Sequence, residues 1–489
     1  MQGEMILYTG RRKILCDAPE ITRENVVAVL TDALSVHRSN RAEIDYLYGY
    51  YRGKQPIMQR TKEIRPEICN KIVENRANEI VSFKTGYLCG EPLQYVSRGS
   101  TNEVSDGIQK LNDMMLLCGK AAKDKELAEW MYICGTGYRM ITPNSPYINT
   151  SIVPKLLRQK VSFSEDESPF SLYTLDPRNA FVVYHSGLGE PPVMGVKYVE
   201  QKDKAIIYSV YTPTQYFEIV SENLVSGLRV KYSERRTLGA IPIVEYPLNN
   251  ARQGAFEVVL PMLDAINTVQ SNRLDGIEQF IQSLTVFYNC DIDNDAAKTL
   301  NQYGLVKIKS FGELKADVKI IAEQLDQSQT QTLIDYMHQT VLDIVGMPNR
   351  NGGSSTSDTG TAVQLRDGHS SAESRAKADE LMFKESEQQV LKIALAIMRS
   401  TVGTTLKLAD VETRFTRRNY EQLQSKAQVL VEMLGCDKIA PSLAFAHCGM
   451  FSDAEDAAKM SAEHYERVKA EQAAKAPPDE PPKDGGAVA

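Results

Sequence analysis

The sequence predicts an α+β fold in which helices predominate, and three observations support this prediction. Apolar residues recur at helical spacing through long segments in both halves of the chain. Between residues 136 and 248, β-branched and aromatic residues instead alternate with polar ones, which is typical of an antiparallel sheet with one buried face. A shorter strand-like segment, 284–322, lies between two helical segments. We therefore expect a helical layer packed on a sheet, followed by a projecting helical hairpin.

Three helices are expected before the sheet. Apolar periodicity within residues 1–60 predicts a long helix, and Gly53 and Pro56 end it. A second helix is predicted over 66–84 from an apolar stripe, with Pro66 at its start and Gly86 after its end; the stripe consists of Ile68, Ile72, Ala77, Ile80 and Val81. A third is predicted over 105–133.

After residue 253 the pattern changes to two long helices, 254–283 and 323–346, on either side of the compact α/β segment 284–322. A helix of 30 residues can approach ~45 Å in length. The apolar stripes of these helices are too modest to be buried within a single monomer. They imply lateral neighbours, and head-to-tail interfaces that close produce rings.

A polar segment, 347–360, follows, in which Asn, Gly and Ser predominate, so a loop is expected. Thr361 and Gln364 form a potential capping box at the start of a long helix that continues to Val402. Two or three short helices are predicted up to about residue 472. The last segment, 473–489, is too polar and proline-rich to form a core and is predicted to be disordered.

Composition excludes several classes of protein. The chain has 489 residues, with 56 Lys and Arg against 63 Asp and Glu, a net charge of −7. A dedicated DNA-binding protein usually carries a basic excess, which is missing here. No apolar run approaches the ~20 residues that cross a bilayer, and the N-terminus lacks the pattern of a secretory signal. The eight cysteines are scattered singly, so free thiols are expected in a chain made in the cytoplasm.

The sequence also lacks the motifs of an enzyme. It contains no G-x-x-x-x-G-K-[ST] phosphate loop, no G-x-S-x-G elbow and no H-E-x-x-H zinc motif. Asp291, Asp293 and Asp295 resemble the start of a calcium loop, but Ala296 and Gln302 occupy positions that require Gly and Glu. An acidic solvated rim is therefore favoured over an incidental ion site. We expect no catalytic residue, cofactor or metal.

Charge is distributed unevenly. Residues 254–346 contain six basic and thirteen acidic residues, which accounts for the whole net charge of the chain. This acidity has two interpretations: a solvated helix surface, or a surface that faces a polyanion without holding it, since each neutralised phosphate adds affinity. The loop 347–360 carries only two charges, Arg350 and Asp358, among small polar groups suited to weak phosphate contacts.

Several strings support a more specific assignment. They are YYRGKQPI at 50–57, NKIVENRANEIVSFKTGYLCGEPLQY at 70–95, LDPRNAFVVY at 175–184, LGAIPIVEYPLNN at 238–250 and LPMLDAINTVQSNRLDGIEQF at 260–280. In these strings and their order, the chain resembles the portal proteins of tailed double-stranded DNA bacteriophages, in the SPP1-like branch. The resemblance covers residues 22 to 420.

The resemblance implies a portal-type ring subunit with wing, stem, clip and crown, in a ring of twelve copies through which DNA passes. It maps residues 1–253 to the wing, 254–283 and 323–346 to the stem, 284–322 to the clip, 347–360 to the tunnel loop, 361–472 to the long helix and crown, and 473–489 to the tail. It also implies location in the virion, at the portal vertex of the capsid, after synthesis in the cytoplasm of a bacterial host.

The implied partners are double-stranded DNA, bound without sequence preference, the terminase large subunit, a head–tail adaptor, and the major capsid and scaffold proteins. No membrane and no catalytic activity are implied. The expected DNA-contacting residues of the tunnel loop are Asn349, Arg350, Asn351, Ser354, Ser355 and Thr356. The expected channel-lining acids are Asp264, Glu278, Glu323, Asp335 and Asp343. The expected docking residues of the clip are Asp291, Asp293 and Asp295.

Two other functions are kept as alternatives. A nucleic-acid-processing enzyme subunit of a packaging machine would need a Walker motif or metal-binding carboxylates near basic residues. A cellular scaffold protein could also form a ring, and electron micrographs would distinguish it by the lack of an open central channel.

Overall fold

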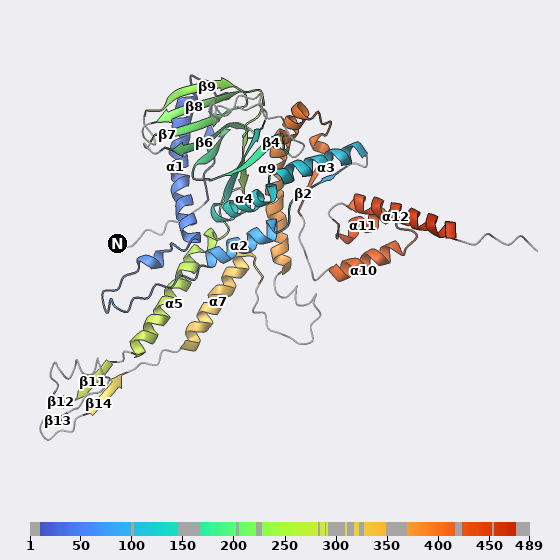
Figure 1. The fold of residues 1–489 in the computed structure, drawn as a ribbon. Coiled ribbons are helices and arrows are strands. Elements are labelled where there is room, and N and C mark those ends of the chain that lie inside the picture. Colours follow the sequence, from blue (N-terminus) through green and yellow to red (C-terminus); the bar gives the residue numbers. More distant parts are fainter. Residues whose placement is uncertain are drawn as a thin grey trace, which may run out of the picture.

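The structure is a computed structural model that describes residues 10–98, 102–144, 167–201, 205–221, 227–281, 284–288, 290–291, 309–310, 317–321, 327–348, 369–415, 423–451 and 454–475. Helices predominate, and the strands between residues 136 and 247 follow one another with no described helix between them, so the predicted α+β class is confirmed. Figure 1 shows a body of helices and sheets from which a helical hairpin projects, with short strands at its far end.

Nine strands form two sheets in the body. The six-stranded sheet has the order β1 (Ile14–Cys16), β5 (Ala180–His185), β6 (Pro192–Glu200), β7 (Ile206–Tyr211), β8 (Gln215–Ser221) and β9 (Arg229–Arg235). Strands β5 to β9 form the expected antiparallel meander, whereas β1 pairs in parallel with β5. A three-stranded antiparallel sheet has the order β10 (Ile243–Pro247), β3 (Thr136–Pro143) and β4 (Phe170–Leu175).

The prediction of a single sheet over 136–248 is therefore wrong. The three-stranded sheet stands between two hydrophobic cores. On β3, Met140 packs into the core shared with the six-stranded sheet, while its neighbour Ile141 packs into the core shared with the helices. Because successive residues of a strand point to opposite faces, a strand buried on both faces cannot belong to a sheet with one solvated side.

Three pairs of short strands complete the sheets. They are β2 (Gln94–Ser97) with β15 (Val411–Arg414), β11 (Leu284–Tyr288) with β14 (Asp317–Ile321), and β12 (Cys290–Asp291) with β13 (Lys309–Ser310). The last two pairs lie at the far end of the projecting hairpin (Figure 1).

The helices of the body are α1 (Val26–Tyr51), α2 (Arg76–Cys89), α3 (Asn102–Leu117), α4 (Lys120–Cys134) and α9 (His369–Thr401), with 3-10 turns η1 (Pro56–Gln59) and η4 (Leu408–Asp410). Helix α1 runs beside the six-stranded sheet, and α2, α4 and α9 gather around the helical core (Figure 1).

Two helix predictions need correction. The predicted helix 105–133 is two helices, because the chain turns at Gly119, whose φ of 64° favours glycine. The predicted helix 66–84 begins only at Arg76. The residues before it are held in another conformation by α5, as described below.

Near the C-terminus, the predicted short helices are confirmed as α10 (Leu423–Leu434), α11 (Pro441–Cys448) and α12 (Ala454–Lys475). These three helices pack on one another in sequence order. Helix α12 continues to Lys475, so the tail predicted from residue 473 begins at least three residues later; the rest of it lies outside the described residues.

A buried ionic cluster joins α4, β3 and α9 in the helical core. Arg139 lies 2.6 Å from Asp124 and 3.4 Å from Glu387, and Lys120 lies 2.6 Å and 3.3 Å from the same two carboxylates. The hydroxyls of two buried tyrosines, Tyr95 and Tyr246, also donate to Glu387. Burial alone raises the pKa of Glu387, but the two cations and the tyrosine hydroxyls lower it to about 2.

Replacing Glu387 with Ala should leave two buried cations with one carboxylate between them. We expect the free energy of unfolding to fall by about 3–5 kcal/mol, measured by denaturant unfolding. The exposed Glu385 on the same helix provides the matched control, and Glu385→Ala should change stability by no more than about 0.5 kcal/mol. Equal stability of the two variants would contradict a structural role for the cluster.

Candidate functional site

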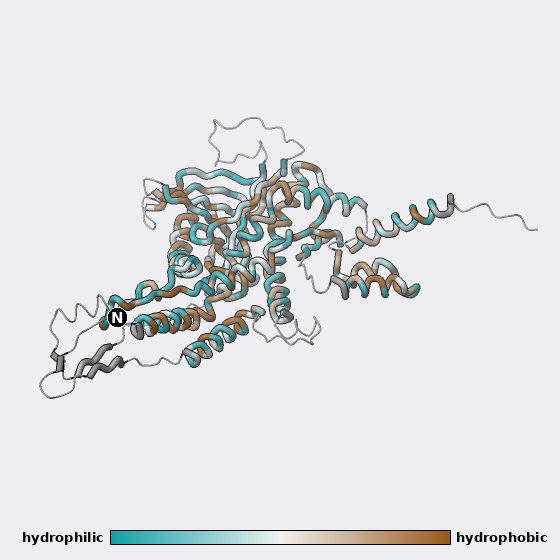
Figure 2. Tube along the Cα trace, turned by 60° about the horizontal axis from the view of Figure 1, so that its bottom comes forward, coloured by the Kyte–Doolittle hydropathy of each residue, from teal (hydrophilic) through white to brown (hydrophobic). Residues whose placement is uncertain are grey.

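The projecting hairpin consists of α5 (Leu260–Ile281) and α7 (Gln327–Val345), which pack against each other. Both predicted helices are confirmed, although α5 begins at Leu260 because a 3-10 turn, η3 (Glu257–Val259), precedes it. Near the tip, the Arg273 guanidinium donates to the side-chain oxygen of Gln331 over 2.6 Å. Figure 2 shows apolar and polar residues interspersed along both helices. The hairpin thus has a contact between its helices and a large exposed surface.

Residues 54–75, here called the strap, connect α1 to α2 and run along α5. Three alternate backbone N–H groups of the strap donate to three side chains spaced one turn apart on α5. The pairs are Asn70 to Asp275 at 2.7 Å, Ile72 to Ser271 at 2.9 Å, and Glu74 to Asn267 at 2.8 Å. Two residues of extended chain advance ~6.6 Å and four residues of helix ~6 Å, so the two repeats match. This ladder is why residues 66–75 are not helical.

Asp275 of α5 holds the middle of the strap in place, through contacts with Arg60, Lys62 and Asn70. Its carboxylate is buried, lies 3.0 Å from Arg60 and 2.5 Å from Lys62, and accepts a second hydrogen bond from the Asn70 side chain. Burial raises the pKa of Asp275, but the hydrogen bonds from Lys62 and Asn70 and the charge of Arg60 lower it to about 2. Sequence reasoning missed this site, because its cations lie about two hundred positions away along the chain.

The acids predicted to line a channel do not share one surface. Asp264 accepts a hydrogen bond of 2.8 Å from the Tyr50 hydroxyl of α1, and burial raises the pKa of its carboxyl. Glu278 is half-buried and stands two turns after Ser271, on the strap-facing side of α5. Asp335 and Asp343 of α7 are exposed. Of the four described acids, only the two on α7 are therefore exposed; Glu323 lies outside the described residues.

The other predicted residues are placed only in part. Asp291 lies in β12, opposite Lys309 of β13. The remaining docking and loop residues lie outside the described residues: Asp293, Asp295, Asn349, Arg350, Asn351, Ser354, Ser355 and Thr356.

Both flanks of the segment 349–368 are anchored in the body. Helix α7 ends with a hydrogen bond of 2.9 Å from the Met347 N–H to the Leu342 carbonyl, around Gly346 with a φ of 69°. The guanidinium of Arg375, on α9, donates to the Ile344 carbonyl over 2.8 Å. A Cβ on Gly346 would stand 2.1 Å from the Arg375 Cδ, so glycine also makes room for this contact. The start of α9 is thereby tied to the end of α7.

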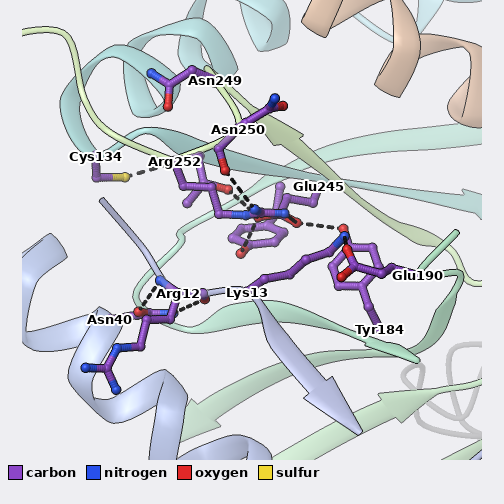
Figure 3. Close-up of polar contacts among 12 residues, drawn as sticks. Arg12, Lys13, Asn40, Cys134, Tyr184, Glu190, Glu245, Asn249, Asn250 and Arg252 are labelled. Carbon is purple, nitrogen blue, oxygen red and sulfur yellow. Dashed lines mark hydrogen bonds and ion pairs between the residues drawn. The ribbon is translucent and has the colours of Figure 1, made fainter. Parts of the chain in front are cut away.

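The hairpin joins the sheets through a second polar cluster (Figure 3). Arg252 makes two hydrogen bonds to Glu245, of 2.8 Å and 3.0 Å, and the Tyr184 hydroxyl donates to the same carboxylate over 2.6 Å. Burial raises the pKa of Glu245, but Arg252 and the hydroxyls lower it below its ordinary value. Arg252 has a φ of 53°, and the N–H of Arg11 donates to its carbonyl over 3.0 Å. The N-terminal segment thus clamps the connection between β10 and η3.

The described residues were also searched for a metal site and for membrane-spanning helices. Within them, no three His, Cys, Asp or Glu side chains are grouped so that they could hold a metal ion. None of the helices in the same part of the chain is both long enough and apolar enough to span a membrane.

The ion pairs of Asp275 predict a pH dependence. Its pKa falls from 3.8 to about 2 on folding, so the pairing stabilises the folded chain fully above about pH 4 and is lost as the pH falls toward 2. Asp275→Asn should therefore be less stable than the unmodified chain at pH 6, and the gap should narrow below pH 4. Unfolding temperatures measured from pH 6 to pH 2.5 test this, with Asp343→Asn on the exposed side of α7 as control. A gap independent of pH would contradict the assignment.

Comparison with known proteins identifies the family of the chain. A search of curated proteins finds no match to the chain. Among solved structures, the chain is similar to one described as "Neck of empty GTA particle computed with C6 symmetry", with 11% sequence identity over 76% of this chain and 90% of that chain and a TM-score of 0.39. The family model described as "Phage portal protein, SPP1 Gp6-like" matches residues 33–477, from within α1 to beyond the end of α12. The chain therefore belongs to the SPP1 Gp6-like family of phage portal proteins.

Proposed function

We propose that the chain is the subunit of a ring that conducts double-stranded DNA through one vertex of a phage capsid. The family is structural and implies a ring-forming oligomer at that vertex. The finer roles belong to the proposal: a ring of twelve copies, initiation of capsid assembly, docking of the terminase large subunit during packaging, joining to a head–tail adaptor, contact with capsid and scaffold proteins, and release of DNA. No catalytic step is assigned to the chain.

The observation that carries the proposal is the exposed surface of α7. Three apolar side chains, Leu333, Tyr336 and Ile344, are 49%, 67% and 40% exposed. At about 100° per residue, they lie within an arc of about 80° on one side of the helix, away from the buried Leu342. Such a stripe on a projecting helix is costly in water and favours association with another copy.

The acids of α7 support passage of a polyanion. Asp343 borders the apolar stripe, and Asp335 lies farther around α7; both are exposed. A surface that repels phosphate forms no ionic contacts with it, so it adds no affinity that would slow the sliding of DNA. We assign the channel lining to these two acids and not to Asp264, whose carboxyl is held by Tyr50.

Two further contacts complete the proposal. The tunnel loop contacts DNA through Asn349, Arg350, Asn351, Ser354, Ser355 and Thr356, because small polar groups bind phosphates without reading sequence. The tip of the hairpin docks partners through Asp291, Asp293 and Asp295.

Replacing Asp335 and Asp343 together with Lys should slow DNA translocation, because each lysine creates a new phosphate contact. The loss should be larger at low ionic strength, where screening is weaker. A packaging assay at two salt concentrations measures the rate. The matched variant, with both residues changed to Asn, removes the acids without adding cations and should slow translocation less. An unchanged rate in the Lys variant would contradict the electrostatic argument.

The loop gives a separate test of the function. Light scattering and electron microscopy of the purified chain should show a closed ring with an open channel. A variant lacking residues 349–357 should form the same ring but package less DNA, because α7 and α9 are anchored outside the deletion. A chain that stays monomeric at micromolar concentration would overturn the proposed function, and loss of the ring only in the deletion variant would overturn the assignment of the loop.

A further inference from the structure

We propose that neighbouring copies meet along the hairpin, with the apolar stripe of α7 in one copy packed on the outer face of the strap in the next. This inference rests on the proposed function, because it requires a ring. It assigns two surfaces that have no partner within the described part of the chain. These are the α7 stripe, made of Leu333, Tyr336 and Ile344, and the strap face, made of Lys54, Pro56, Met58 and Lys71.

The strap has an inner and an outer side. On its inner side, Gln55 and Ile57 are buried, and η1 packs against α5. Met58, the next residue, is 49% exposed on the outer side, and Lys54, Pro56 and Lys71 are exposed as well. The ammonium of Lys71 donates to the Met58 carbonyl over 3.0 Å. This bond and the ladder to α5 hold the outer face in place before any partner arrives.

The strap and α7 lie on different sides of α5. Figure 1 shows α5 between the short helical turn η1, drawn in blue, and α7. A head-to-tail ring needs this arrangement, since each copy must present two different and complementary surfaces to its two neighbours. Strap, α5 and α7 of one copy would be followed by the strap of the next.

The two surfaces also stand at the same height on the hairpin. Adjacent residues of α5 hold both: Asn272 accepts a hydrogen bond from Arg60 of the strap, and Arg273 donates to Gln331 of α7. Met58 lies two positions before Arg60, and Leu333 lies two positions after Gln331. In a ring whose axis runs along the hairpin, rotation keeps this height, so Met58 and Leu333 face each other around the ring.

The charges at the edges of the two surfaces are complementary. The exposed carboxylate of Asp343, seven residues after Tyr336 and so about 20° from it around the helix, stands at the edge of the α7 stripe. The strap face carries the ammonium groups of Lys54 and Lys71. Opposite charges at the rim of an apolar contact orient the partners and exclude other registers. The occupant that fits the strap face is therefore a second copy of this chain.

A charge-swap experiment tests the contact. Leu333→Asp and Met58→Lys each place one charge in the apolar contact, and each should raise the concentration needed for ring formation at least tenfold, measured by light scattering. Because each ring interface contains one residue from each copy, the double variant restores an opposite-charge pair and should recover ring formation to within about threefold of the unmodified chain. Both residues are half-exposed within one copy, so the circular dichroism and melting of the monomer should not change. Leu188→Asp, in the exposed β5–β6 turn, is the matched control and should keep the ring.

A cross-linking experiment keeps the inference testable if the swap fails to recover the ring. Mild oxidation of the Leu333→Cys, Met58→Cys double variant should give covalent ladders of copies on a non-reducing gel. The single variants correct for the native cysteines. Rings that persist in both charged single variants, without a ladder in the cysteine pair, would overturn this interface and leave the proposed function standing. Failure of the unmodified chain to form rings would instead overturn the proposed function.

Discussion

The rest of the structure depends on how the backbone of the strap is satisfied. An extended segment laid on a helix cannot use sheet pairing, and buried N–H groups without acceptors are costly. Helix α5 provides the acceptors through Asn267, Ser271 and Asp275, at a spacing that matches the strap. This contact fixes the rotation of α5 about its own axis. It thereby decides which surfaces of the hairpin remain for other molecules.

Contacts within the chain also decide which acids of the hairpin remain exposed. The segment 254–346 has many acids in the sequence, but two of them form ion pairs within the chain: Glu257 with Arg11, and Asp275 with Arg60 and Lys62. The remaining exposed acids of the described hairpin are concentrated on α7. The exposed acidic residues therefore lie on α7 and not on both helices of the described hairpin. For this reason, α7 is the helix whose acids should be changed to test the passage of DNA.

Sequence reasoning succeeded where structure follows from local pattern. The apolar stripes of α5 and α7 report the period of a helix whatever they pack against, so these two helices were predictable. Helix α9 was predictable because the chain has no Gly or Pro from His369 to Val402. The conformation of the strap was not predictable. Its residues 66–75 have a helix-like pattern, but its backbone N–H groups donate to side chains of α5, about two hundred residues away in the sequence. The pairing of β3 with β4 and β10 in a second sheet was not predictable for a similar reason. It depends on two hydrophobic cores whose residues come from distant parts of the sequence. Among the candidate site residues, the exposure of Asp343 follows from helical position, whereas the bond of Asp264 to Tyr50 depends on tertiary packing.

The junction of Gly346 with Arg375 has a consequence for how this family could vary. The end of α7 and the start of α9 are held together by the contact of Arg375 with Ile344 and Gly346. Residues can therefore be added or removed between the two helices without repacking either of them. Loop length costs little conformational free energy, about 0.6 kcal/mol per doubling. In the proposed ring, insertions and deletions at this one position would change the width of the channel, while the helices on either side keep their packing.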